Sequence, residues 1–278
     1  CILRNITERL FMLKKEISKI IYRKQFVAIF ITFFAAAMVD FLITCKNYYG
    51  VELSWVRSAY KCGILNNEIG MFTNQFFGTL FPLMVCVGVS DVFCTENAMG
   101  ITNFIYSRTT PKKNILSKII AVILVSFFMT FIPLMANFLL TFTAFPLQGF
   151  YCSNASYLTL TYPEEGRIFG YLEMFYPYFN CIVYILIRCV IGSTLAVFSF
   201  SLSLLKIFNR YVILFSAMIY YVLYSSVSGL PLFSNTIVNT NIFSINGYGS
   251  GWMIFAFLLF SWLLSFIMIL VGIKKETY

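Results

Sequence analysis

Six long apolar stretches constrain this chain more than any other feature. A helix needs about 20 mostly apolar residues to cross the roughly 30 Å hydrocarbon layer of a membrane, because each residue advances it by about 1.5 Å. Asp40 and Arg188 are the only charged residues within these stretches, and the apolar residues run continuously instead of alternating as in a membrane β-barrel. We therefore predict transmembrane helices at about 26–45, 71–90, 119–141, 178–202, 211–230 and 252–272.

The composition supports the same fold class. Of the 278 residues, 60% are apolar and 11% are charged, whereas soluble domains average about 45–50% and about 25%. The net charge of +9 comes from basic residues grouped beside the apolar stretches. That grouping favours contact with a membrane surface over contact with nucleic acid. We expect an all-α polytopic membrane protein.

The residue inventory excludes several classes of enzyme. The chain contains no histidine, which removes the commonest general base and the commonest metal ligand. Its eight cysteines form no C-x-x-C pair, so we expect neither a metal site nor a catalytic site. A phosphate-binding loop of the form G-x-x-x-x-G-K-[ST] is also missing from the sequence. The chain is therefore not expected to hydrolyse ATP.

Basic residues predict the orientation of the spans. Fifteen Lys and Arg residues lie in the first 25 residues, in 91–118, in 203–210 and in the tail 273–278, whereas four lie in the alternate connections. Because Lys and Arg accumulate on the cytoplasmic side, we predict that both termini and the 91–118 loop are cytoplasmic. A bacterial cytoplasmic membrane is the expected location.

The first 25 residues are predicted to form a helix of their own. Apolar residues recur at three- and four-residue steps with charged residues between them, which indicates an amphipathic helix lying in the inner membrane interface. The charges interrupt any apolar block of the kind that a signal peptide has. A soluble helical arm is the alternative interpretation. The transmembrane domain would then cover 26–272.

The loop between the second and third predicted spans is longer than a turn requires. It mixes apolar and polar residues, which fits a short amphipathic helix that ends before Pro111; these residues include Val92, Phe93, Met99, Phe104, Asp91, Glu96 and Asn97. Such a helix is suited to docking into a groove on a soluble partner. The alternative is a loop that rests on lipid headgroups.

This loop resembles the segment that follows the second span in ABC type-2 permeases, the membrane subunits of ATP-binding-cassette exporters. The resemblance rests on the pattern Asp91-x-Phe93-x-x-Glu96-x-x-x-Gly100, followed by Ser107-Arg108 and by Lys118. The segment LKKEISKIIYRKQF, with Glu16, Lys19, Arg23 and Lys24, is similar to the interfacial helix that precedes that family's first span. The six-span layout agrees over the whole chain.

The resemblance implies a dimer of permeases, identical or related, with two cytoplasmic ATPase subunits that bind ATP and Mg. In that arrangement the loop carries a coupling helix that seats in a groove of the ATPase. Carried onto this sequence, the contact or hinge residues are Asp91, Phe93, Glu96, Gly100 and Arg108. Gly100 could permit a sharp bend or a close backbone approach, and Glu96 could pair with a basic residue of the partner or cap a local helix.

An exporter of amphipathic or hydrophobic cargo is the predicted function, with an antimicrobial or lantibiotic-like peptide favoured and with lipid or polysaccharide as alternatives. Transport would proceed by ATP-driven alternating access. A proton-coupled six-span transporter is the competing hypothesis, in which Asp40 would carry the proton. A membrane anchor that scaffolds a sensor is a weaker one.

Two further pairs of residues are candidates. Asp40 and Arg188 are intramembrane charges, which usually face the protein interior; an ion pair between them is favoured, with Asp40 reaching outward or relaying protons as alternatives. Cys62 and Cys152 fall in different external loops and could form a disulfide, although free thiols, or pairing with Cys45, fit equally well.

Overall fold

A computed structural model describes residues 2–52, 55–65, 80–90, 92–106, 110–147, 169–207, 209–228 and 251–277. The structure of these ranges is helical, and the α-helices are its main elements. The helices are α1 (Ile2–Ile21), α2 (Lys24–Tyr48), α3 (Ala59–Cys62), α5 (Phe81–Val89), α6 (Val92–Ala98), α7 (Ile101–Tyr106), α8 (Pro111–Ala144), α9 (Gly170–Phe175), α10 (Pro177–Leu204), α11 (Arg210–Ser228) and α12 (Gly251–Thr277).

Within the described residues, four helices are long and apolar enough to cross a membrane, as in a membrane-embedded protein. These segments are Lys24–Tyr48, Pro111–Ala144, Pro177–Leu204 and Ile254–Lys275. The apolar part of α11, Arg210–Tyr224, is shorter. The predicted second span, 71–90, is described only from residue 80 onward, where it contains α5. The four long spans agree with the sequence, and the total of six stays a prediction.

The centre of the bundle is α10, which packs against α8, α12, α5 and α11. In its most apolar window 72% of the residues are buried inside the protein, compared with 22% in α2 and in α12. Small residues such as Gly192 and Ser199 let neighbouring helices approach its backbone. The Ser193 and Ser203 hydroxyls are satisfied by carbonyls of α10 itself. This centre is buried inside the protein, while α2 and α12 keep apolar faces exposed on its surface.

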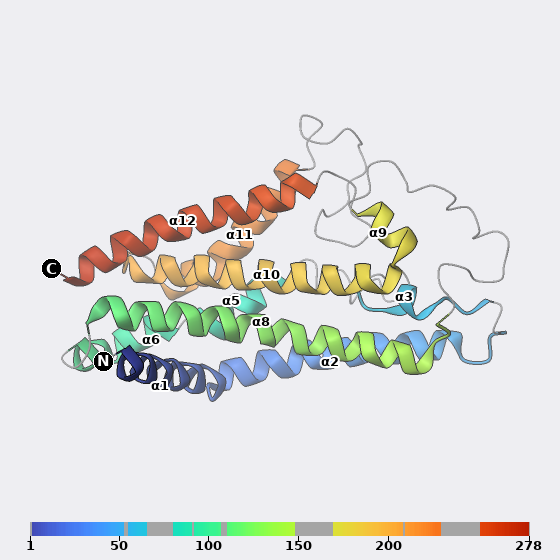
Figure 1. Cartoon of the computed structure of the whole chain (residues 1–278), viewed down its shortest axis with the longest axis horizontal. Coiled ribbons are helices and arrows are strands. Elements are labelled where there is room, and N and C mark those ends of the chain that lie inside the picture. Colours follow the sequence, from blue (N-terminus) through green and yellow to red (C-terminus); the bar gives the residue numbers. More distant parts are fainter. Residues whose placement is uncertain are drawn as a thin grey trace.

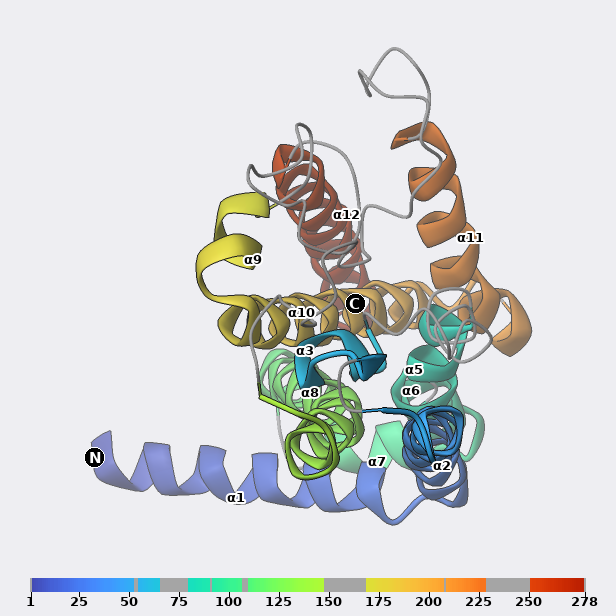
Figure 2. The ribbon, with the colours of Figure 1, turned by 90° about the vertical axis from the view of Figure 1, so that its right-hand side faces the viewer.

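The N-terminal helix α1 runs across the bundle instead of along it, as Figure 2 shows. It packs against α8 and buries Ile20, while Lys15 on its other side is exposed. The chain turns sharply after Ile21 and continues as α2. An amphipathic helix in this position separates an apolar side, which meets the bundle, from a basic side.

One end of the bundle gathers both chain termini together with α6 (Figure 1). The opposite end carries α3 and α9. Helix α8 begins at Pro111, eight residues before the predicted span at 119. Its first turn holds the exposed Lys112 and Lys113. The extra turns bring the start of α8 beside α1 and α6, where a polar cluster forms.

Candidate functional site

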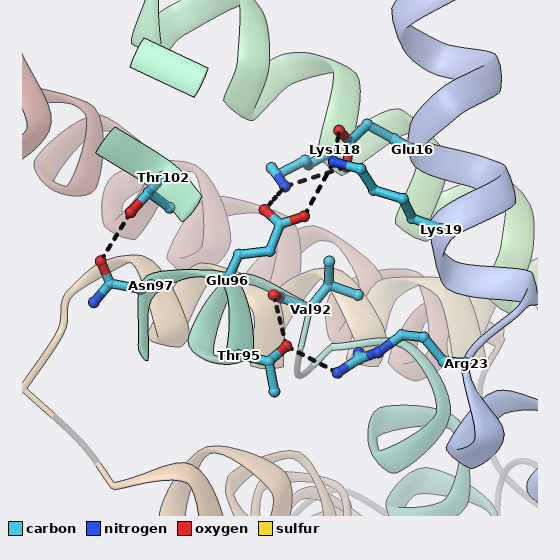
Figure 3. A network of polar contacts seen from close by, with 9 residues as sticks. All are labelled: Glu16, Lys19, Arg23, Val92, Thr95, Glu96, Asn97, Thr102 and Lys118. Carbon is cyan, nitrogen blue, oxygen red and sulfur yellow. Dashed lines mark hydrogen bonds and ion pairs between the residues drawn. The ribbon is translucent and has the colours of Figure 1, made fainter. Parts of the chain in front are cut away.

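Four charged side chains from three helices meet at this end of the bundle, and we call them the ion ring (Figure 3). Glu16 and Lys19 come from α1, Glu96 from α6 and Lys118 from α8. They are separated by up to 102 positions in the sequence. The ring therefore ties together the N-terminal helix, the loop helix and a long span.

Charges alternate around the ring, and each carboxylate uses both of its oxygens. Glu16 contacts Lys19 Nζ through Oε1 at 2.9 Å and Lys118 Nζ through Oε2 at 3.2 Å. Glu96 contacts Lys19 Nζ through Oε1 at 3.3 Å and Lys118 Nζ through Oε2. Each lysine thus bridges the two glutamates, and the ring has no net charge.

Burial makes this pairing obligatory. Lys118 is 1% exposed, Glu16 7% and Glu96 8%, and a charge removed from water is tolerated only when it is paired and hydrogen-bonded. Lys19 is the more exposed member, with 44% of its side chain accessible. Burial alone would lower the pKa of Lys19, but its hydrogen bond to Glu16 and the charges of Glu16 and Glu96 outweigh this and raise that pKa. Lys19 therefore stays protonated at neutral pH.

A second contact fixes α6 to the start of α2. The Arg23 Nη2 group donates to Thr95 Oγ1 at 2.8 Å, and Thr95 Oγ1 donates in turn to the Val92 carbonyl at 3.0 Å. Arg23 is the residue immediately before α2. The short helix α6 is therefore held from two neighbouring positions, by Glu96 in the ring and by Thr95 at the α1–α2 turn.

Glu96 pairs with basic residues of its own chain. The sequence predicts that Glu96 pairs with a basic residue of a partner or caps a local helix; the two lysines of the ring occupy both Glu96 oxygens instead. Phe93 is fully buried, with its ring edge-on to Phe200 of α10 at 6.3 Å between centroids. It anchors α6 in the core and presents no surface to another subunit.

Gly100 makes a sharp bend. Its φ of +70° lies in the left-handed region, which glycine adopts without strain, and a Cβ there would meet nothing within 4 Å. The bend, and not a close backbone approach, is thus what requires glycine. It divides the predicted single amphipathic helix into α6 and α7, which are joined by a hydrogen bond from Thr102 Oγ1 to Asn97 Oδ1 (3.3 Å).

Apolar side chains on either side of the bend are exposed at the end of the bundle. Met99 is 70% exposed and Phe104 77%, with Ile101 at 39%. We call these three residues the apolar tip. The predicted contact residues Asp91 and Arg108 lie outside the described residues. Among the described residues of the predicted coupling loop, the tip is an apolar surface that is open to contact from outside.

Asp40 and Arg188 are both buried, but the predicted pair between them is not among the ion pairs of the described residues. Arg188 Nη1 donates to Tyr221 Oη at 3.4 Å, and its guanidinium lies 5.8 Å from the Phe81 ring centre. Helices α2 and α10 both pack on α5 and α8 and make little contact with each other. Asp40 is 0% exposed, so it does not reach outward to water either.

Only one of the two cysteines of the predicted disulfide lies among the described residues. Cys62 is buried at the end of α3, where its thiol donates to the Arg57 carbonyl (3.6 Å), and Cys152 lies outside the described residues. A pair between them stays a prediction. No group of three or more Cys, Asp or Glu residues that could hold a metal ion occurs within the described part of the chain.

All four residues of the ion ring occur in the sequence motifs described above, but the sequence did not predict that they contact one another. A signal was present at Glu16, which lies three residues after Leu13 and four before Ile20 and therefore on the apolar face of α1. A carboxylate on such a face needs a buried cation as a partner. Nothing in the pattern says that this cation is Lys118.

Comparison with protein-family models, with curated proteins and with solved structures finds no match to this chain.

Proposed function

We propose that this chain is the permease subunit of an ATP-binding-cassette exporter and that it forms the translocation path for an amphipathic or hydrophobic cargo, with an antimicrobial peptide favoured. The observation that carries the proposal is the ion ring, which links the loop helix α6 to α1 and to the span α8. A force applied to the exposed apolar tip would pass through this ring into the bundle.

The attachment of α6 to α1, α2 and α8 is suited to transmitting motion from the loop to the spans. Phe93, Thr95 and Glu96 hold α6 against the core, α2 and the ring. Exposed apolar residues then follow within a few positions. A rigid base with an apolar tip fits a helix that docks into a groove on a soluble subunit. Two copies of the chain would work with two ATPases.

The energy for transport would come from ATP hydrolysis by the partner ATPase. ATP can shift the permease between inward- and outward-open states only if it binds one state of the assembly more tightly, and that difference must reach the spans through a physical contact. The chain has no phosphate-binding loop of its own. ATP and Mg would be bound by the ATPase, and the apolar tip with the ion ring would provide the contact.

Photo-crosslinking in native membranes tests this proposal. A photoreactive residue replaces Phe104 in the tip, and a matched control replaces Leu139, an exposed apolar residue in the outer half of α8. We expect the Phe104 variant to crosslink to a nucleotide-binding ATPase and the yield to change when ATP and vanadate are added. Absence of an ATPase product, or an identical product from Leu139, would contradict the proposal.

A second measurement separates this function from proton-coupled transport. If the chain were a proton carrier, replacement of the buried Asp40 by Asn would abolish transport, and transport would continue in membranes depleted of ATP. An ATP-driven permease gives the opposite dependence: transport stops without ATP.

A further inference from the structure

A groove lies in the angle between α1, α2 and α8. It has a volume of about 480 Å³, within the range of about 300–1,000 Å³ of small-molecule sites. Every side chain lining it is apolar; the residues are Ile17, Ile21, Phe26, Val27, Phe30, Leu124, Val125, Phe128, Met129 and Ile132. It could hold a hydrocarbon chain but offers no polar partner to a hydrophilic ligand.

The groove opens away from the bundle. Phe26 and Met129 form its buried base, whereas Val27, Phe128 and Ile132 are 43%, 51% and 45% exposed along its open side. Since α2 and α8 are both long enough to span a membrane, this open side faces the acyl chains of the leaflet that contains α1. Lipid therefore has direct access to it.

Basic side chains border the groove where α1 crosses it. Lys14 precedes Ile17 and Ile21 by three and seven residues, which places it on the same face of α1. Lys24 begins α2, one turn before the lining residue Val27. Both lysines are exposed, and no ion pair among the described residues engages either of them.

The acidic residues nearby do not offset this charge. Glu16 is neutralised within the ion ring by Lys19 and Lys118. The described part of α1 from residue 11 onward, with the turn that follows it, therefore presents an uncompensated positive charge beside an apolar groove. That combination is complementary to a molecule with a long hydrocarbon chain and an anionic head.

We propose that this groove is a specific binding site for one anionic phospholipid, whose acyl chain lies along Val27 and Phe128 and whose phosphate is held by Lys14 and Lys24. The site depends on the protein being membrane-embedded and not on the exporter function. A bound lipid would fill the angle between α1 and α2 and stabilise the crossing of α1 over α8.

Native mass spectrometry of the full chain tests the headgroup half of the site. The protein is released from bilayers of equal parts phosphatidylglycerol and phosphatidylcholine, and the lipid that remains bound is identified. We expect one phosphatidylglycerol to be retained. Lys14→Gln and Lys24→Gln should each weaken this preference about five-fold, the factor that corresponds to about 1 kcal/mol for a basic residue near an anionic membrane. Lys46→Gln, at the opposite end of α2, should leave it unchanged.

A variant that fills the groove tests the part of the site that would bind the acyl chain. Val27→Trp occupies the groove and should abolish retention, whereas Leu42→Trp, at another exposed position of α2 outside it, should not. Thermal unfolding of both variants in detergent checks that each one folds. Excess inorganic phosphate should fail to displace the lipid, because phosphate alone does not fill the groove.

Several outcomes would overturn the proposal. Equal retention of the two lipids would remove the headgroup specificity, and loss of lipid with Leu42→Trp as readily as with Val27→Trp would show general annular contact. Displacement by inorganic phosphate would show that the groove contributes nothing. If Val27→Trp instead changed the oligomeric state, the groove would be an interface between copies of the chain.

Discussion

At the scale of single residues, the ion ring explains how four charges are accommodated where the helices meet. Lys118 is the critical member because it is 1% exposed and contacts both glutamates. Lys19 also contacts both but remains partly accessible to water. The buried side of the ring therefore carries more of the energetic cost of a broken pair than the accessible side.

Replacement of Lys118 by Met should destabilise the protein strongly. The change leaves Glu16 and Glu96 buried with only Lys19 as a partner, so we expect the free energy of unfolding to fall by about 3 kcal/mol. Thermal unfolding in detergent measures it. Lys113→Met, at an exposed position of the same helix, should stay within about 0.5 kcal/mol of the wild type.

The same measurement on Glu96→Gln and on the double variant completes a cycle. Residues in direct contact should show a coupling free energy of about 1 kcal/mol or more. If the two single effects on the free energy of unfolding were additive, Glu96 and Lys118 would not form an ion pair, and the ion ring would be contradicted.

Gly100→Ala tests the bend between α6 and α7. At φ +70° an alanine should cost about 1–2 kcal/mol in backbone strain, although no neighbouring atom is within 4 Å of the new Cβ. Gly100→Asn should cost less, because asparagine adopts this conformation more readily. The control is Gly63→Ala, where φ is negative and the nearest atom is 4.0 Å away. Equal unfolding temperatures for Gly100→Ala and Gly63→Ala would contradict the left-handed backbone conformation of Gly100.

At the scale of helices, the packing depends on small residues at close contacts. A Cβ added to Gly272 of α12 would lie 2.7 Å from the Leu204 Cβ of α10. That atom is fixed to the backbone, so the helices themselves would have to separate. A Cβ at Gly88 of α5 would approach most closely the flexible end of Met129, with its Sδ at 3.1 Å.

We therefore expect Gly272→Ala to destabilise the bundle by about 1–3 kcal/mol, and Gly88→Ala to have a smaller effect. Thermal unfolding in detergent compares the two. Should Gly88→Ala prove the more damaging, the close approach of α12 to α10 would not be the contact that limits this packing.

Helix positions were largely predictable from the sequence, because a continuous apolar run of membrane length has few other solutions. The predicted spans at 26–45, 119–141 and 178–202 fall within α2, α8 and α10. Helix ends were less predictable. Helix α8 starts at Pro111, and its N-terminal part carries the exposed Lys112 and Lys113 and the buried, paired Lys118. No local pattern distinguishes a paired lysine from a hydrated one.

The candidate site was predictable only in part, for the same reason. The pattern around Glu96 and Gly100 covers the segment that contributes Glu96 to the ion ring, and Gly100 makes a bend in it. The role of Glu96 was not predictable, because its two partners lie 77 and 22 positions away. The exchange of the predicted Asp40–Arg188 pair for an Arg188–Tyr221 contact has the same origin: it depends on which helices are neighbours.

At the scale of the whole molecule, the bundle has two distinct ends. One holds both termini with α6, and the other holds α3 and α9 (Figure 1). With α10 at the centre and with α2 and α12 at the periphery, a displacement of the apolar tip would reach the spans through α8 and α1. Coupling to an ATPase requires that the end with the tip lie in the cytoplasm, where ATP is available.

Sidedness of the apolar tip is the most direct test. A cysteine replaces Met99, which is 70% exposed in the tip, or Trp55, which is 58% exposed before α3, and a membrane-impermeant maleimide is added to intact and to permeabilised cells, with the unsubstituted chain as background. We predict that Trp55→Cys is labelled in intact cells and Met99→Cys only after permeabilisation. Labelling of Met99→Cys in intact cells would contradict the account, because no cytoplasmic ATPase could then reach the tip.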